Sequence, residues 1–216
     1  MRPYFIDESQ PIYIPSVVDI DTYYAGVYQL PDYLEYVARD FMYRERHYIK
    51  NMGFTLLTKE FLDELSEFLK GKKVLEIMSG TGFLASQLRL RGVDIIATDD
   101  MTGIYDFKTI HIDDIEAIDC VDAIDKYHKD INYVIMSWPE MSNDAARALR
   151  SCYEYDIPLI YIGEFSKNGC TADAEFYEFA AHYFDNYWEI GNKYRTFLGL
   201  HDTCRLLKKK GKIKDV

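Results

Sequence analysis

The stretch Lys73-Val74-Leu75-Glu76-Ile77-Met78-Ser79-Gly80-Thr81-Gly82-Phe83-Leu84-Ala85 decides the fold of this chain. It begins as a short apolar run with one acidic residue, continues as a glycine-rich turn, and opens an amphipathic segment at Phe83. This order predicts a buried strand that passes into a helix within a few residues. Gly80 and Gly82 tolerate the positive φ angles of a tight turn and let a ligand approach the backbone closely. The stretch therefore predicts a nucleotide-binding loop, without saying which nucleotide.

The charge balance limits the partners of the protein. The 216 residues carry a net charge of −11 and the pI is near 4.9, which argues against a broad basic surface that grips duplex nucleic acid. The length suits one large domain with an elaboration at one end. We therefore expect a small-molecule or protein substrate, and the oligomeric state stays open. A solvated tail, and not a nucleic-acid contact, is expected for the lysines at the C-terminus, Lys208, Lys209, Lys210, Lys212 and Lys214.

The cysteines and histidines give no sign of a metal site. The four cysteines are widely spaced without a Cys-x-x-Cys pair, and the histidines show no ligand spacing, so neither a zinc site nor a dithiol redox site is expected. Unpaired thiols fit a reducing compartment. The N-terminus has no apolar signal core, and no apolar run approaches the roughly 18 to 20 residues that span a bilayer. We expect a cytoplasmic protein with no membrane contact.

Residues 1–53 are predicted to form an aromatic-rich arm that precedes a domain of residues 54–216. The arm holds nine of the nineteen tyrosines, and four of the six prolines lie in its first 31 residues. An irregular segment with at most one short helix is expected before Pro31, followed by a helix from Pro31 to about Lys50. The aromatic content predicts that the arm packs on the domain, either as a lid over a pocket or as a cover of the core. A further helix is expected from Thr58, its N-cap, to Lys70.

Strands and helices alternate from residue 72 onward. This alternation predicts an α/β three-layer sandwich with a mostly parallel sheet and helices on both faces. The runs Tyr187–Phe197 and Asp202–Leu207 are expected to close the sheet as an antiparallel hairpin. The expected strands are 72–78, 93–98, about 115–118, 131–136 and 158–163, and the expected helices are 83–91, 120–128, 142–154 and 172–184.

With these elements in this order, residues 54–210 resemble the class I S-adenosylmethionine-dependent methyltransferases. In that family the first strand ends in an acidic residue followed by spaced glycines, and here Met78 stands where the first glycine is usual. The resemblance implies S-adenosyl-L-methionine as the cofactor. It assigns the cofactor loop to Glu76, Met78, Ser79, Gly80 and Gly82.

The resemblance also assigns the acidic residues after the second and third strands. It implies that Asp99, with Asp100 beside it, accepts hydrogen bonds from the ribose hydroxyls of the cofactor. It implies an adenine contact at Asp119-Cys120. Asp113-Asp114 is a competing position for that contact, because residues 109–112 can themselves be read as a strand.

Ser137-Trp138-Pro139-Glu140 follows the fourth strand, where amino-group methyltransferases of this family often carry Asn/Asp/Ser-Pro-Pro-aromatic. Ser137 and Pro139 match that pattern, whereas Trp138 replaces the first proline and Glu140 replaces the aromatic residue. The partial match predicts a nitrogen target, less readily an oxygen, and argues against a nucleobase substrate because the stacking ring is missing. Glu164, after the fifth strand, is expected either to orient or deprotonate a substrate amine or to be a solvated carboxylate.

Two other functions are compatible with the sequence. Gly80-x-Gly82-x-x-Ala85 with Asp99 downstream also fits a dinucleotide-binding fingerprint, and so an NAD(P)-dependent oxidoreductase. Glu76 at the end of the first strand and the closing hairpin favour the methyltransferase. A catalytically silent scaffold with the same fold is the second alternative. His201-Asp202 is expected to be a turn histidine beside a carboxylate and not a catalytic dyad, because no partnered nucleophile accompanies it.

Overall fold

The structure of the chain, a computed structural model, describes residues 13–102, 114–187 and 190–211. In these ranges seven strands form one sheet in the order β3-β2-β1-β4-β5-β7-β6. The first five strands along the chain run parallel, and β7 pairs antiparallel with both β5 and β6. The strands are β1 (Lys73–Ile77), β2 (Asp94–Asp99), β3 (Ile115–Ala117), β4 (Tyr133–Ser137), β5 (Leu159–Glu164), β6 (Phe184–Tyr187) and β7 (Asp202–Lys209).

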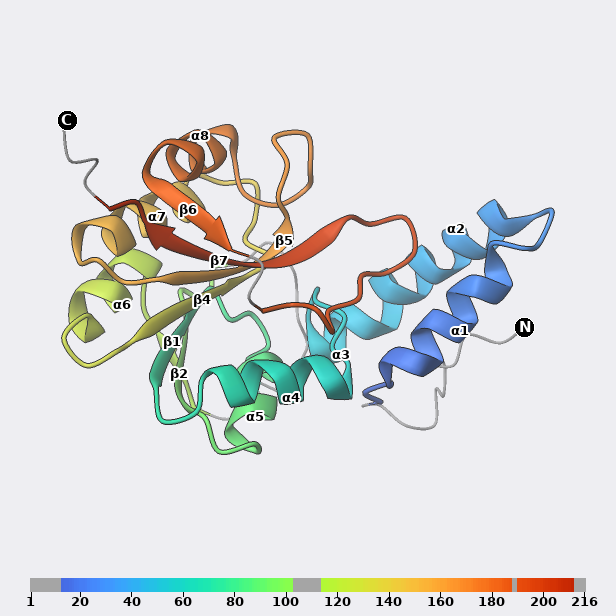
Figure 1. Ribbon diagram of the computed structural model, residues 1–216, viewed down its shortest axis with the longest axis horizontal. Coiled ribbons are helices and arrows are strands. Elements are labelled where there is room, and N and C mark those ends of the chain that lie inside the picture. The colour runs from blue at the N-terminus through green and yellow to red at the C-terminus, as the bar shows by residue number, and fades with distance from the viewer. Residues whose placement is uncertain (1–12, 103–113, 188–189, 212–216) are drawn as a thin grey trace.

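Helices cover both faces of the sheet (Figure 1). On one face lie α4 (Lys59–Phe68) and α5 (Phe83–Arg89), and on the other lie α6 (Cys120–Tyr127), α7 (Asp144–Glu154) and α8 (Ala174–Tyr183). Successive side chains of a strand point to opposite faces, so Val74 belongs to the first hydrophobic cluster and Leu75 to the second. The three layers confirm the predicted α/β sandwich.

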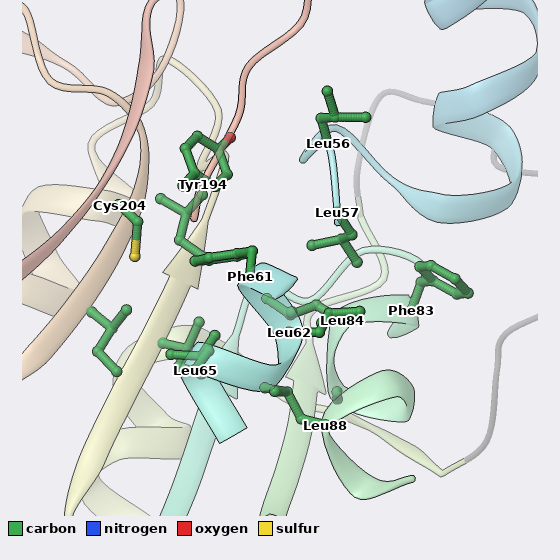
Figure 2. Packing of buried hydrophobic residues seen from close by; sticks show 14 of the residues in the cluster. Leu56, Leu57, Phe61, Leu62, Leu65, Phe83, Leu84, Leu88, Tyr194 and Cys204 are labelled. Carbon is green, nitrogen blue, oxygen red and sulfur yellow. The ribbon is translucent and has the colours of Figure 1, made fainter. Parts of the chain in front are cut away.

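The central strand β1 places the predicted loop at the middle of the sheet. Leu75 is paired with Ile96 of β2 and with Val134 of β4. Helix α4 packs beside α5 over this part of the sheet, with Leu62 beside Leu84 and Phe61 near Tyr194 (Figure 2). Its N-cap is Thr58, as predicted, whose hydroxyl accepts a hydrogen bond of 3.0 Å from the backbone N–H of Phe61.

The helix predicted from Pro31 to about Lys50 is present, and the segment before Pro31 is more regular than expected. Helix α1 (Val17–Val27) has a complete capping box at Ser16, and α2 (Tyr33–Tyr43) continues through a π-helical turn, η1 (Arg44–Tyr48), into α3 (Ile49–Met52). Figure 1 shows α1 and α2 side by side, extending away from the α/β body. The helical part packs on that body, as expected from its aromatic content: the Tyr24 hydroxyl donates to the carbonyl of Thr196 at 2.6 Å.

The predicted C-terminal hairpin is wrong in its first strand. Tyr187–Phe197 was expected to be that strand, whereas β6 ends at Tyr187 and the described residues 190–201 are irregular. The apolar residues of this connection pack against helices instead. The ring centroids of Tyr194 and Phe61 are 5.0 Å apart, and those of Phe197 and Tyr48 are 4.9 Å apart. The aromatic residues whose spacing resembled that of a strand therefore pack in the core between the sheet and the N-terminal helices.

Two remaining expectations concern cysteines and membranes. All four cysteines are free, as the spacing indicated. Within the described ranges, no helix combines the length and the apolar character that crossing a bilayer requires.

Candidate functional site

A cavity of about 430 Å³ opens beyond the carboxyl ends of β1, β2 and β4, within the size range of small-molecule sites. This is the position at which open parallel sheets bind ligands. Most of the predicted site residues line it, but Gly82 and Glu164 are not among the lining residues. Those that line the cavity are Glu76, Met78, Ser79, Gly80, Asp99, Asp100, Asp119, Cys120, Ser137, Trp138 and Pro139.

The glycine-rich loop has a left-handed backbone at three positions. The φ angles are 52° at Met78, 55° at Gly80 and 69° at Gly82. Gly82 is the N-cap of α5, and its backbone N–H donates to the carbonyl of Ser79 at 2.9 Å. Met78 thus adopts the conformation for which glycine is the usual choice, at a strain of about 1 kcal/mol.

Glu76 is a buried carboxylate in the cavity wall. Its side chain is only 1 % exposed, and Oε2 has no hydrogen-bond partner in the described part of the protein. Burial raises the pKa of Glu76 to about 8, although a hydrogen bond from the backbone N–H of Ala85 acts in the opposite direction. A buried, unpaired carboxyl oxygen is costly, so its position in a ligand-sized cavity points to a ligand that donates a hydrogen bond or carries positive charge.

Asp99 connects the carboxyl ends of β1 and β2. Its Oδ2 accepts from the backbone N–H of Gly80 at 2.8 Å, and its Oδ1 accepts from that of Met101 at 2.9 Å. Each carboxylate oxygen keeps a further lone pair for a ligand. The neighbouring Asp100 accepts from both the backbone N–H and the hydroxyl of Thr102, at 2.9 and 2.7 Å. Asp99 therefore shapes the loop and faces the cavity at the same time.

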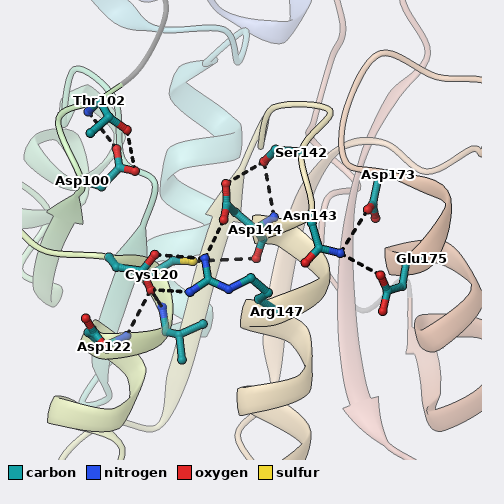
Figure 3. A network of polar contacts seen from close by, with 12 residues as sticks. Asp100, Thr102, Cys120, Asp122, Ser142, Asn143, Asp144, Arg147, Asp173 and Glu175 are labelled. Carbon is teal, nitrogen blue, oxygen red and sulfur yellow. Dashed lines mark hydrogen bonds and ion pairs between the residues drawn. The ribbon is translucent and has the colours of Figure 1, made fainter.

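Asp119 is the N-cap of α6 and pairs with Arg147, whose contacts with Asp144 Figure 3 also shows. Its Oδ1 accepts from the backbone N–H of Val121 at 2.8 Å, and both its oxygens accept from Arg147 at 3.1 Å. Burial raises the pKa of Asp119, but these hydrogen bonds outweigh it and hold the pKa below its usual value. Asp113 and the alternative strand at 109–112 lie outside the described residues, whereas β3 ends two residues before Asp119.

Asp119, Cys120 and Asp144 bring three potential metal-ligand atoms within 4.8 Å of one another. A cation is already supplied there, because Arg147 donates to Asp144 at 2.7 Å as well as to Asp119. Burial raises the pKa of Cys120 to about 12, which keeps its sulfur protonated near neutral pH. The cluster therefore has the chemistry of an ion-pair network.

The other end of the cavity is built where β4 meets the N-terminal segment. The hydroxyl oxygens of Ser137 and Thr55 are 2.5 Å apart. Trp138 has a φ of 52°, and its backbone N–H donates to the carbonyl of Ile162 at 2.7 Å. Its ring is stacked on that of Phe54, with centroids 5.5 Å apart and planes 13° from parallel. Thr55 and Phe54 were missed by sequence reasoning, because only the tertiary fold brings residue 54 to residue 138.

A buried carboxylate holds the indole of Trp138 from its edge. Asp202 is 6 % exposed, and its Oδ2 accepts from Trp138 Nε1 at 2.9 Å and from the hydroxyl of Tyr194 at 3.2 Å. Burial raises the pKa of Asp202 to about 6. Arg44, only 3 % exposed, places its guanidinium 4.6 Å from the Trp138 ring centroid. The sequence offered no signal for Arg44, and Asp202 was expected to be a turn carboxylate.

Glu164 connects two loops outside the cavity. Its Oε2 accepts from the backbone N–H of Cys170 at 2.8 Å, and its Oε1 accepts from that of His201 at 3.1 Å. Burial raises the pKa of Glu164, but these two backbone donors outweigh it and keep the pKa below its usual value. The geometry is that of a carboxylate that stabilises the entry to β7.

A similar architecture is found in a solved structure. A crystal structure of the O-methyltransferase from Bacillus cereus in complex with SAH superposes with a TM-score of 0.51, at 13% identity, over 88% of this chain and 97% of that one. The chain shares the fold of that enzyme. The likeness shows the fold alone, at 13% identity.

Two other solved structures are more distant. A SAM-dependent methyltransferase from Archaeoglobus fulgidus gives a TM-score of 0.44 at 14% identity, over 78% of this chain and 99% of that one. MtNAS in complex with MTA and tNA gives 0.47 at 14% identity, over 87% and 68%. No known family profile and no curated protein sequence matches the chain.

Proposed function

We propose that the protein is an S-adenosylmethionine-dependent methyltransferase. The observation that carries the proposal is the unpartnered, buried Oε2 of Glu76 in the wall of a cavity that Asp99 and Asp119 also line. A ligand with a cationic amino-acid end and a nucleoside end satisfies such a set of carboxylates. The methyltransferase-like fold supports the same conclusion.

The residues present fit this cofactor. Glu76 and the buried, unpartnered hydroxyl of Ser79 face the part of the cavity where the amino-acid end belongs. Asp99 keeps lone pairs for the ribose hydroxyls, and Asp119 with the backbone of Cys120 is left for the adenine. When bound, the cofactor supplies an electrophilic methyl group.

The acceptor in this proposal is a nitrogen of a small molecule or a protein. Ser137 and Pro139 line the cavity at the end of β4, where a hydroxyl and a backbone carbonyl can orient an amine. The chain contributes alignment and exclusion of water, and an amine that arrives unprotonated needs no base. Glu164 is not required for this role, since its carboxylate is engaged elsewhere.

Binding of S-adenosylhomocysteine tests the proposal. We expect calorimetry to show binding to the wild type and at least about tenfold weaker binding to Asp99→Asn, because an amide loses the charge-assisted acceptor. Asp94→Asn is the matched control, since Asp94 is exposed at the opposite end of β2. Normal binding by Asp99→Asn contradicts the ribose assignment. A wild type that binds neither this ligand nor S-adenosylmethionine favours the scaffold, and binding of NADH instead favours the oxidoreductase.

A further inference from the structure

The strand order divides the cavity into two ends. The loops after β1, β2 and β3 lie on one side and contain the residues assigned to the cofactor. On the other side, the segment after β4 meets residues 53–57, which follow α3. This second end carries two aromatic side chains in its wall, Phe54 and Trp138.

Several independent contacts hold both the backbone and the ring of Trp138. Its left-handed backbone is unusual for a bulky residue and is strained, so the surrounding contacts must offset that strain. The backbone N–H is bonded to Ile162, the indole N–H to Asp202, and one ring face is stacked on Phe54. Strained residues of this kind are concentrated at functional sites.

One face of the Trp138 ring is occupied by both Phe54 and Arg44. The Arg44 guanidinium carbon is 4.6 Å from the Trp138 centroid and 5.5 Å from the Phe54 centroid, and the two rings are themselves 5.5 Å apart. If Arg44 and Phe54 were on opposite faces of the indole, they would be much farther from each other. These two side chains therefore share one face and leave the opposite face of Trp138 uncovered by either.

The charges around the cavity select against an anionic ligand. The lining carboxylates Asp99, Asp100 and Glu140 form no ion pair with a described residue, whereas Asp119 and Asp144 are paired with Arg147. Glu140, next to Pro139, is exposed and makes no hydrogen bond or ion pair with a described residue. A negatively charged ligand is repelled by this lining, whereas a neutral or cationic ring gains from the carboxylates and from the indole face.

We propose that this end of the cavity binds a planar, uncharged or cationic ring system that carries the acceptor nitrogen and stacks on Trp138, with Asp202 and Arg44 as positioning residues for that indole. The inference rests on the proposed function, because it names the acceptor class of the same site. It also replaces the expectation from the sequence that a stacking ring is missing: Trp138 supplies the ring two positions earlier than the family pattern has it.

A set of matched probes tests the proposal with S-adenosylhomocysteine already bound. Aniline is planar and neutral, phenyltrimethylammonium is planar and cationic, benzoate is planar and anionic, and cyclohexylamine is cationic without a planar ring. We expect aniline and phenyltrimethylammonium to bind at least about tenfold more tightly than benzoate and cyclohexylamine, because both can stack on the indole and the second also forms a cation–π contact. Equal binding of benzoate, or no binding of either favoured probe at 10 mM, overturns the proposal.

Variants locate the ring-binding surface. Trp138→Leu is expected to lose the preference for the two favoured probes, whereas Trp138→Phe keeps part of it. Tyr155→Leu is the matched control, because Tyr155 is stacked on His128 and does not line the cavity. Unchanged probe binding by Trp138→Leu overturns the inference. Binding of S-adenosylhomocysteine by each variant is measured first, so failure of the cofactor proposal is seen separately from failure of the acceptor proposal.

The positioning role has a spectroscopic readout. Trp188→Phe removes the second of the two tryptophans, so that emission reports Trp138 alone. In that background Asp202→Asn is expected to shift the emission maximum of Trp138 and to weaken phenyltrimethylammonium binding several-fold while leaving S-adenosylhomocysteine affinity within about twofold. Unchanged emission together with unchanged probe affinity shows that Asp202 does not position the indole.

Discussion

The hydroxyl of Thr55 lies 2.5 Å from the hydroxyl of Ser137, across the boundary between the N-terminal helices and the parallel sheet. Thr55 is buried, and its neighbours Phe54 and Leu57 line the same cavity. Ser137 is the last residue of β4. The segment that the sequence placed in or beside an arm is thus tied to the end of a central strand, where it forms part of the cavity wall.

Removing the Thr55 hydroxyl is expected to destabilise the fold by about 1 to 2 kcal/mol, because it leaves a half-buried partner without its hydrogen bond. Thr55→Val, Ser137→Ala and the double variant form a cycle that urea unfolding can measure. We expect a coupling energy near 1 kcal/mol. Ser66→Ala, which removes an exposed hydroxyl bonded to a nearby carbonyl, is the control with little effect. Additive effects in the cycle show that the two hydroxyls do not interact.

Glu76 is expected to make stability fall as the pH rises. Burial raises its pKa from an ordinary value of 4.5 to about 8, so the folded chain keeps a proton that the unfolded chain releases. The loss of stability extends from about pH 4.5 to pH 8 and reaches on the order of 2 to 3 kcal/mol between pH 6 and pH 8. Asp40 and Asp202, whose pKa values burial raises to about 6, contribute chiefly below that interval.

Urea unfolding at pH 6, 7 and 8 measures this dependence. Glu76→Gln removes the titrating group and keeps the volume of the side chain, so its free energy of unfolding should be nearly constant over the interval. A variant curve parallel to that of the wild type assigns the pH dependence to another group.

The order of strands and helices could be predicted because the information is local. Lys73–Ile77 is an apolar run that ends at a turn with glycines, and Gly71 and Gly92 have positive φ angles near the ends of α4 and α5. The resemblance of the loop and its acidic residues to a family pattern also predicted the position of a ligand site. Glu76, Asp99 and Asp119 follow from that order, since neighbouring parallel strands place their carboxyl ends together.

The sequence placed Trp138 among the site residues, but the contacts that hold its ring could not be predicted, because they are non-local. Phe54, Trp138 and Asp202 are far apart in sequence, and no spacing rule relates them. The strand expected from Tyr187 to Phe197 failed for a similar reason. Alternating apolar residues are compatible with a strand and also with an irregular segment that packs on helices. The tertiary contact of Tyr194 with Phe61 decides between these two structures.

Gly191 has a steric role that a matched pair of substitutions can isolate. Its φ is 93°, and a Cβ there would lie 2.8 Å from the Cβ and 2.9 Å from the carbonyl oxygen of Cys204 in β7. Gly92 has a φ of 83° with nothing within 4 Å of the added atom. We expect Gly92→Ala to cost about 1 to 2 kcal/mol and Gly191→Ala about 3 kcal/mol or more in urea unfolding. Equal costs indicate that backbone strain alone accounts for both.

The contact between α1 and α2 depends on an ionised buried carboxylate. The Tyr23 hydroxyl lies 2.9 and 2.8 Å from the two oxygens of Asp40, a residue only 1 % exposed. Burial raises the pKa of Asp40 to about 6, and the hydroxyl opposes this by stabilising the charged form. Tyr23→Phe should therefore destabilise the protein by about 1 to 3 kcal/mol at pH 8 and by less at pH 4.5, where Asp40 is protonated. Tyr28→Phe, at an exposed position, should have little effect at either pH, and an equal loss at both pH values for Tyr23→Phe contradicts the ionic explanation.

Binding of S-adenosylhomocysteine is expected to release a proton if Glu76 faces its ammonium group. At pH 7 the free carboxyl is mostly protonated, because burial raises its pKa to about 8, and a nearby cation favours the ionised form. Calorimetry in buffers of different ionisation enthalpy should show the release of up to about one proton per site, with affinity that rises as the pH approaches 8. Glu76→Gln should abolish the release and weaken binding more than about tenfold, whereas Glu140→Gln, an exposed carboxylate in the same cavity, should leave the release unchanged. If Glu76→Gln releases as many protons as the wild type, another group titrates on binding, and Glu76 does not contact the ammonium group of the cofactor.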